Sequence, residues 1–286
     1  MGKLKYTFKT DTLFKILFSK YPDLLKKLVS ELLKIRIDSI EQFLITNPDI
    51  PPDVIGNKYC RLDISMLVNG KMVDLEVQVE SEEDYPDRVL YYWAREYSTA
   101  LKKGNNYSDL LQTIHISIVN FLMFDCDEFH SEFVLLEVTR HTPLTDKMCL
   151  HFFELPKAPD LADKDSKLEL WLSLFKADTE EALAKIEALG VPEMKQAIDA
   201  YREITVTPEF IEIERLRHKA HHDEMQALHI ARKKERMRWE PIVAEKDAII
   251  ADKDAALAQK DAEKDAALAQ KDAIIAELKA KLDGFS

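Results

Sequence analysis

The sequence contains little glycine, and its few glycines lie where the chain is expected to turn. Only 6 of the 286 residues are Gly. Gly56 and Gly70 lie beside or within a predicted hairpin, Gly104 follows a predicted helix, and Gly190 lies near Pro192 between two predicted helices. The sequence therefore has no Gly-rich loop of the kind that cradles nucleotide phosphates. This absence argues against a nucleotide cofactor.

Cysteine is also scarce, and long apolar runs are missing. The three cysteines, Cys60, Cys126 and Cys149, are odd in number and show no C-x-x-C spacing, which argues against a disulfide framework and a zinc ribbon. We expect buried thiols in a reducing cytoplasm. No run reaches the roughly 18 apolar residues of a membrane helix, and no signal-peptide stretch follows the first residues. A soluble cytoplasmic protein without a membrane partner is expected.

The net charge of −12 is unusual for a nucleic-acid-binding protein, but the charge is unevenly distributed. Residues 1–36 carry nine basic and three acidic side chains, and residues 215–238 carry eight basic and three acidic ones. Either stretch could steer a phosphate backbone, since such contacts supply sequence-independent affinity. A solvated helix face is the alternative interpretation of both stretches.

The residues around Asn69-Gly70 predict a β-hairpin with one polar and one apolar face. Asn-Gly is the preferred pair for a two-residue type I′ turn, because both positions need positive φ. With this turn Val68 pairs with Lys71, and the same register sets Asp63 opposite Glu76. Side chains alternate along a strand, so every second residue of each strand belongs to the same face of the hairpin. The polar face comprises Arg61, Asp63, Ser65, Asp74, Glu76 and Gln78; the core face comprises Leu62, Ile64, Met66, Val68, Val73, Leu75, Val77 and Val79.

The opposition of Asp63 and Glu76 is the candidate metal site. Two like charges directly opposed on a sheet destabilise the pairing unless a positive charge lies between them. A divalent cation would resolve the conflict, and oxygen-only ligands favour a hard ion such as Mg²⁺ or Mn²⁺. An ordinary amphipathic hairpin with a solvated polar face is the alternative.

These residues resemble a known family. The run Arg61-Leu62-Asp63, followed by Asp74-Leu75-Glu76-Val77-Gln78-Val79-Glu80, is similar to the PD-(D/E)xK nuclease core in a variant that ends in E-x-Q. More specifically, it resembles the Rpn family of recombination-promoting nucleases, also described as transposases of the PD-(D/E)xK superfamily. The flanking segments at residues 8–18, 88–92, 104–107 and 113–118 fit as well. The resemblance covers about residues 4–156.

The resemblance implies a metal-dependent DNA endonuclease that promotes recombination. By analogy with the family, Asp63, Glu76 and the backbone carbonyl of Val77 hold Mg²⁺, with Mn²⁺ as an alternative. Gln78 stands where many relatives have a catalytic Lys. Because Gln78 is uncharged, stabilisation of the transition state would depend more on the metal or on a nearby lysine, either Lys9 or Lys15.

Two alternatives remain open at the sequence level. Asp11 is a further candidate ligand for the ion, or it caps the helix that begins beside it. The whole protein could instead be a catalytically weak or inactive nuclease fold that acts as an oligomeric interaction protein. This second function would explain the missing Lys and the acidic total charge, but the intact Asp63 and Glu76 argue against it.

Hydrophobic periodicity predicts an α/β fold in which a mixed sheet is flanked by helices, and the family resemblance implies that this is the fold of restriction endonucleases. An apolar strand near Ile114, Ile116 and Ile118 is typical of a strand buried on both faces. We predict helices at 9–35 with a break at Pro22, 84–103, 163–175, 179–189 and 192–204, and strands at 37–46, at the hairpin, and at 112–124, 132–139 and 148–153.

Three regions are predicted: a nuclease-like domain at 1–158, a helical accessory region at 159–206, and a long helix with a coiled-coil tail at 207–286. Residues 253–263 recur almost unchanged as 264–274. The apolar positions follow steps of 7, 11, 7 and 7, which indicate a heptad coiled coil with one stutter. These apolar positions are Ile250, Leu257, Leu268, Ile275 and Leu282. A homo-oligomer is expected.

His218 and His222 lie on one face of a predicted helix at the i, i+4 spacing that zinc ligands can use. His221 and Asp223 lie beside them in the sequence. No third ligand is evident from the sequence. We interpret this group as surface histidines on a charged helix.

Overall fold

The computed structural model describes residues 2–46, 64–99, 101, 104 and 106–283. The candidate ligand Asp63 and the thiol of Cys60 lie outside the described residues. The chain divides into two compact units, Met1–His218 and Lys219–Ser286, and we describe each by itself.

The first unit contains a mixed six-stranded sheet in the order β1-β2-β3-β4-β6-β5. The central neighbours β3, β4 and β6 run parallel, whereas β1, β2 and β5 pair antiparallel with their neighbours. All seven residues of β4 are buried, as expected for a strand covered on both faces. The strands are β1 (Phe43–Ile45), β2 (Ile64–Val68), β3 (Lys71–Gln78), β4 (Thr113–Val119), β5 (His130–Phe133) and β6 (Met148–Glu154).

The β2–β3 hairpin has the predicted turn and register. Val68 pairs with Lys71 and Ser65 with Asp74, while Asn69 and Gly70 both have positive φ, at 47° and 75°. The Asn69 side chain also donates to the backbone carbonyl of Ser39 at 2.7 Å. The turn is therefore fixed both by its own dihedral preference and by a contact with the preceding loop.

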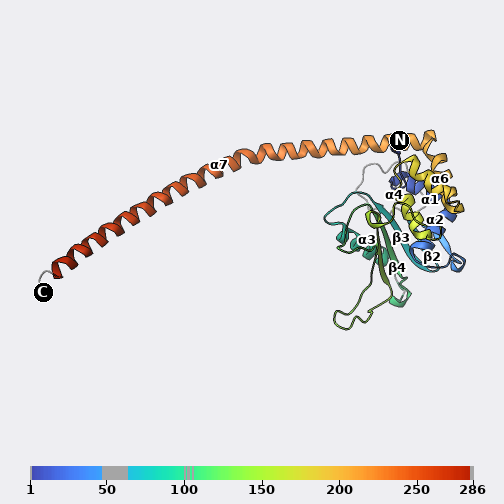
Figure 1. Ribbon diagram of the computed structural model, residues 1–286, viewed down its shortest axis with the longest axis horizontal. Coiled ribbons are helices and arrows are strands. Elements are labelled where there is room, and N and C mark those ends of the chain that lie inside the picture. Colours follow the sequence, from blue (N-terminus) through green and yellow to red (C-terminus); the bar gives the residue numbers. More distant parts are fainter. Residues whose placement is uncertain (1, 47–63, 100, 102–103, 105, 284–286) are drawn as a thin grey trace. The chain divides into compact units, whose positions relative to one another are not determined.

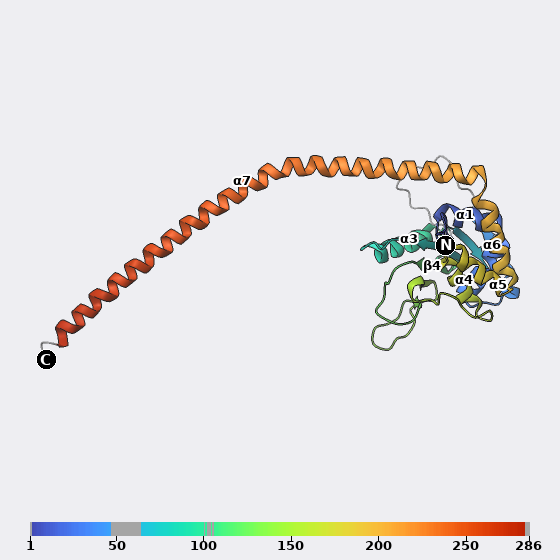
Figure 2. The same cartoon turned by 45° about the horizontal axis from the view of Figure 1, so that its top comes forward.

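Helices cover the two faces of the sheet unequally. One hydrophobic core joins the face formed by Val73, Leu75, Ile114 and Ile116 to α1, α2, α4, α5 and α6. A smaller core joins the other face to α3 through Tyr85, Val89 and their neighbours. Both views show α3 across the sheet from α1, α4 and α6 (Figures 1 and 2). The helices of this unit are α1 (Asp11–Lys20), α2 (Pro22–Leu32), α3 (Tyr85–Thr99), α4 (Lys167–Lys176), α5 (Glu180–Ala188) and α6 (Pro192–Thr205), with short 3-10 turns η1 (Ile37–Ser39), η2 (Tyr107–Asp109) and η3 (Leu155–Lys157).

The helices at residues 159–206 share the core of α1 and α2. Trp171 on α4 and Ile198 on α6 are fully buried in that core, and the Tyr201 hydroxyl donates to the backbone carbonyl of Tyr6 at 2.9 Å. The aromatic side chain of Phe210 packs edge-on against Tyr6 at 4.8 Å. Residues far beyond the sheet thus help to hold the first helices of the chain.

Three predicted strands differ from the observed ones. The strand predicted at 112–124 is shorter, because β4 ends at Val119. The 37–46 segment begins with η1, and only Phe43–Ile45 forms a strand. The strand predicted at 132–139 is wrong in most of its length, because β5 ends at Phe133. Beyond Phe133 the chain leaves β6, and apolar residues such as Val138, which is 89% exposed, lie at the surface. The β-branched composition favoured a strand, but the segment forms only an isolated antiparallel bridge between Leu136 and Pro143, which does not bury its apolar side chains.

The second unit consists of the main part of α7 (Pro208–Asp283), which contains Pro241 in its interior. The predicted seam residues Ile250, Leu257, Leu268 and Ile275 are each about half exposed or more in the single chain. A continuous helix is confirmed, while its pairing into a coiled coil stays a prediction. Among the helices described, none combines the length and the apolar character that crossing a membrane requires.

Candidate active site on the α3 face of the sheet

The carboxylate of Glu76 lies near the carboxyl end of β3, on the face covered by α3. Glu76 is buried, and its neighbour across the parallel pairing is Ser117 on β4. Asp74 lies two residues earlier on the same face and is completely buried beside His115. The polar face of the hairpin is therefore an interior surface. The interpretation of this face as solvated is wrong for these residues, because α3 excludes water from it.

Arg88 on α3 supplies the cation of this site. Its Nη2 atom lies 3.1 Å from Glu76 Oε1 and donates to Gln78 Oε1 at 2.9 Å. Its Nη1 atom donates to Glu82 Oε2 at 2.5 Å. The guanidinium also lies over the ring of Tyr85, 4.9 Å from its centroid, which favours a fixed orientation. One arginine thus joins the first turn of α3 to the end of β3.

Gln78 is the last residue of β3, and its amide is fully engaged. The Nε2 group donates to the Glu80 carbonyl at 2.9 Å and approaches Glu82 Oε1 at 3.4 Å, while the Oε1 atom accepts from Arg88. Gln78 itself is uncharged, and the positive charge that contacts it belongs to Arg88 on α3.

Burial sets the electrostatics of the two acids. Desolvation raises the pKa of Glu76, and the positive charges of Arg88 and Lys15 oppose this shift. Desolvation raises the pKa of Asp74 to about 7; a hydrogen bond with Ser65 opposes the shift, and Glu96 and Glu76 add to it. Burial and nearby Arg88 lower the pKa of His115 to about 4. The neutral imidazole therefore adds no positive charge at neutral pH.

One oxygen of Glu76 is available for a further ligand. Within the described part of the chain, Glu76 Oε2 is buried and has no hydrogen-bond partner. It lies 3.6 Å from His115 Nε2, which instead contacts Ser117 Oγ at 3.1 Å. A buried carboxylate oxygen without a partner is unfavourable. The donor set at this point is suited to a hard cation.

Asp11 and Lys15 bring α1 toward the same site. Asp11 pairs with Lys15 at 2.7 Å and with Arg217 from the beginning of α7. Thr10, not Asp11, is the N-cap residue of α1, so the capping alternative for Asp11 is wrong. Lys15 lies close enough to Glu76 to influence its pKa.

The other lysine considered from sequence is placed differently. Burial lowers the pKa of Lys9, and the charges that influence it belong to Asp178, Lys176 and Lys3. Of the two lysines, Lys15 is the one that the structure brings near Glu76.

Sequence reasoning missed Arg88 and His115 as parts of the site. Arg88 stands within a segment that resembled the family, and His115 is the polar interruption of an apolar strand. Both residues could be noticed in the sequence, but their contacts with Glu76 could not be predicted from it. Those contacts depend on the packing of α3 and on the β3–β4 pairing.

Two further predictions concern the surface histidines and the cysteines. His222 lies 4.0 Å from Asp223, and both are well exposed. Cys149 is buried as expected, whereas the expectation of a buried thiol is wrong for Cys126, which is exposed.

Comparison with known proteins identifies the family. The family described as PD-(D/E)XK nuclease family transposase matches residues 8–231, more than three-quarters of the chain. No curated protein and no solved structure gave a match. The match includes the hairpin, α3 and the helices after the sheet. The chain therefore belongs to the PD-(D/E)XK nuclease family transposases.

Proposed function

We propose that this protein is a Mg²⁺-dependent DNA endonuclease of the recombination-promoting Rpn type. In this proposal Asp63, Glu76 and the Val77 carbonyl hold the ion, with Mn²⁺ as a possible substitute. The observation that carries the proposal is the family match combined with Glu76, a buried carboxylate that keeps one oxygen without a hydrogen-bond partner among the described residues.

The residues present fit a divalent ion. Asp74 and Glu76 place two buried carboxyl groups on one face of β3, and desolvation raises both pKa values. Arg88 contacts only one oxygen of Glu76, and His115 is neutral. A hard cation that accepts oxygen ligands would stabilise the ionised carboxylates. Bound there, Mg²⁺ would polarise the scissile phosphate and lower the pKa of a water molecule.

The side chains around Glu76 have distinct proposed roles. Arg88 holds Glu76 in one rotamer through a charge-assisted hydrogen bond, and it places a permanent positive charge beside Gln78. This charge substitutes for that of the missing Lys in attracting the phosphate. Gln78 orients Arg88 through the hydrogen bond that its Oε1 atom accepts.

The proposed DNA contacts come from α1 and the beginning of α7. Lys15 and Arg217 belong to the two basic stretches of the sequence, and both contact Asp11. The stretches thus meet at one point in the first unit. We propose that they bind the phosphate backbone, that Asp11 organises them, and that a homo-oligomer forms through α7.

The test is nicking of a supercoiled plasmid by the full-length protein in Mg²⁺ and in EDTA. Glu76→Gln removes the ligand charge with little change in shape, and Glu83→Gln is the matched control at an exposed position. Nicking that needs Mg²⁺, is lost in Glu76→Gln and persists in Glu83→Gln supports the proposal. Equal rates for wild type and Glu76→Gln would refute it.

The Arg88–Glu76 ion pair also favours a second candidate function. An arginine beside the carboxylate relieves charge conflict without a metal, as expected if the fold is kept as a scaffold for an oligomeric interaction protein. Isothermal titration with Mg²⁺ distinguishes the two candidates. A scaffold gives no Mg²⁺ binding that depends on Glu76 and no nicking, whereas the endonuclease gives both.

A further inference from the structure

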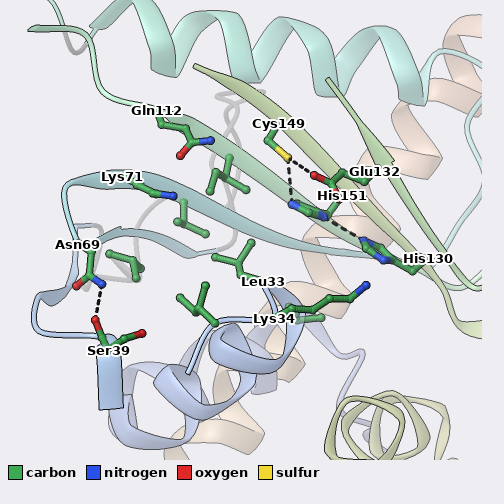
Figure 3. A pocket seen from close by; sticks show the side chains of 15 residues that line it. Leu33, Lys34, Ser39, Asn69, Lys71, Gln112, His130, Glu132, Cys149 and His151 are labelled. Atoms are coloured by element: carbon green, nitrogen blue, oxygen red, sulfur yellow. Dashed lines mark hydrogen bonds between the residues drawn. The ribbon is translucent and has the colours of Figure 1, made fainter. Parts of the chain in front are cut away.

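A second polar cluster lies on the opposite face of the sheet, in a cavity of about 250 Å³. The cavity is bounded by the end of α2, the β2–β3 turn and strands β5 and β6 (Figure 3). Cys149 is the neighbour of Ile114 in the β4–β6 pairing, and Glu76 is the neighbour of Ser117. Because side chains alternate along β4, the two sites face opposite sides of the sheet.

Three potential ligands converge at this cavity. The Sγ atom of Cys149 lies 3.1 Å from His151 Nε2 and 3.5 Å from Glu132 Oε1. All three ligand atoms lie within 4.8 Å of one another. Figure 3 shows the three side chains directed toward one another from β5 and β6. Two ligands of one tetrahedral zinc ion are separated by about 3.5 Å, given bonds of about 2.0 to 2.3 Å. The spacing therefore fits a single ion.

We propose that Glu132, Cys149 and His151 bind one transition-metal ion, with Zn²⁺ as the best fit. A thiolate, an imidazole and a carboxylate together select a borderline-soft ion over Mg²⁺. The ionised thiol and carboxylate balance the charge of Zn²⁺. Three protein ligands leave a fourth position, which faces the cavity and is filled by water or an anion.

His130 positions the imidazole of His151. The two rings are connected by a hydrogen bond of 3.0 Å between His130 Nε2 and His151 Nδ1. When His151 Nδ1 donates to His130, the lone pair of His151 Nε2 is directed toward Cys149 and Glu132. Ligating histidines are commonly oriented in this way by a contact at the second ring nitrogen. His130 itself stacks on Phe153 with ring centroids 4.3 Å apart, which restricts its movement.

The rest of the cavity suits an anion at the open position. Lys34 and Lys71 both line the cavity, and Lys34, which follows the C-cap residue of α2, has a left-handed backbone conformation with φ of 54°. With the charges of the ion, the thiolate and the carboxylate balanced, these lysines make the cavity positive. Hydroxide, or an anionic group of a larger molecule, would be favoured as the fourth ligand.

The experiment uses Co²⁺ as a spectroscopic substitute for Zn²⁺ in the full-length protein, after treatment with a chelator. A thiolate–Co²⁺ bond gives a charge-transfer absorption that carboxylate sites lack. We expect one Co²⁺ per chain with this absorption, and its displacement by one equivalent of Zn²⁺. Cys149→Ser should abolish the absorption, while Cys126→Ser, which changes the exposed cysteine, should retain it.

Further variants make the result decisive if Cys149→Ser fails to fold. Glu132→Gln changes an exposed side chain and should weaken Co²⁺ binding at least tenfold; His130→Asn should weaken it by a similar factor through misorientation of His151. Retention of the absorption in Cys149→Ser, or unchanged affinity in Glu132→Gln, would overturn the proposal. So would wild-type protein that binds no Co²⁺ at micromolar concentration. Glu76→Gln should retain full Co²⁺ absorption, so failure of the nuclease proposal remains distinguishable.

Discussion

The two faces of the sheet present different chemistry from neighbouring strands. The face under α3 carries Asp74 and Glu76, which offer only oxygen atoms, and an arginine that neutralises part of their charge. The opposite face carries Cys149 and His151, which offer sulfur and nitrogen at a cavity beside α2. Hard and soft ligand sets prefer different ions. A two-residue periodicity thus allows one sheet to hold two independent sites.

The largest expected effect is that a variant on one face of the sheet abolishes the function of that face and leaves the function of the other face unchanged. Glu76→Gln should reduce nicking by about 100-fold or more, because it removes a charged ligand of the proposed ion, and should leave Co²⁺ absorption unchanged. Cys149→Ser should abolish the Co²⁺ absorption and leave nicking unchanged. Plasmid nicking and absorption spectra on the same preparations provide the measurement. If either variant impairs both readouts in folded protein, the two faces are coupled and the comparison is wrong.

Removal of the buried charge at Asp74 should stabilise the protein. Its pKa in the folded state is about 7, against 3.8 as the ordinary value. Between pH 4 and 7 the folded state retains a proton that the unfolded state has released, so stability falls as the pH rises. Asp74→Asn should remove this fall and raise the free energy of unfolding at pH 8 by on the order of 2 kcal/mol.

Urea unfolding at pH 4 and pH 8 in EDTA measures this effect. Asp87→Asn, at an exposed position in the first turn of α3, is the matched control and should leave the pH dependence as it is in the wild type. An Asp74→Asn protein that loses as much stability between the two pH values as the wild type would show that Asp74 is not the group responsible.

The positive charge beside Glu76 should still support activity when it is carried by position 78 on β3 and not by Arg88 on α3. Arg88→Gln should reduce nicking by about tenfold, since it removes both the charge and a hydrogen bond to Glu76. Gln78→Lys alone would set two cations side by side and displace Arg88. In the double variant Gln78→Lys/Arg88→Gln the charge returns to β3, and activity should exceed that of Arg88→Gln. A double variant no better than Arg88→Gln would mean that the position of the charge, not its presence, is essential.

The smallest effect on either face is expected from shortening α7. Deletion of residues 240–286 removes the whole predicted coiled-coil seam and no residue of the sheet. Light scattering should show a lower particle mass. Nicking at high enzyme concentration and Co²⁺ binding should change by less than about twofold, because the deleted segment contributes no residue to either proposed site. Equal particle masses for both proteins would exclude this segment as the oligomerisation element.

The sequence was sufficient for features that depend on local preference and on periodicity. The Asn69-Gly70 turn, the β2–β3 register, the buried β4 and the break at Pro22 are each confirmed. It also supported the family, because its motif and its flanking segments occur in the right order. These features are encoded by neighbouring residues, so no distant contact is needed to recognise them.

The tertiary structure decided which polar groups meet. Glu76 and Arg88 are 12 residues apart, and Glu132 and Cys149 are 17 apart. Whether such pairs meet depends on the packing of α3 and on the register of β5 against β6. The predicted strand at 132–139 was wrong beyond Phe133 for the same reason: burial by a partner strand, not composition, determines where a strand ends. The sequence alone therefore determined the alternation of faces, and only the fold decided what covers each face.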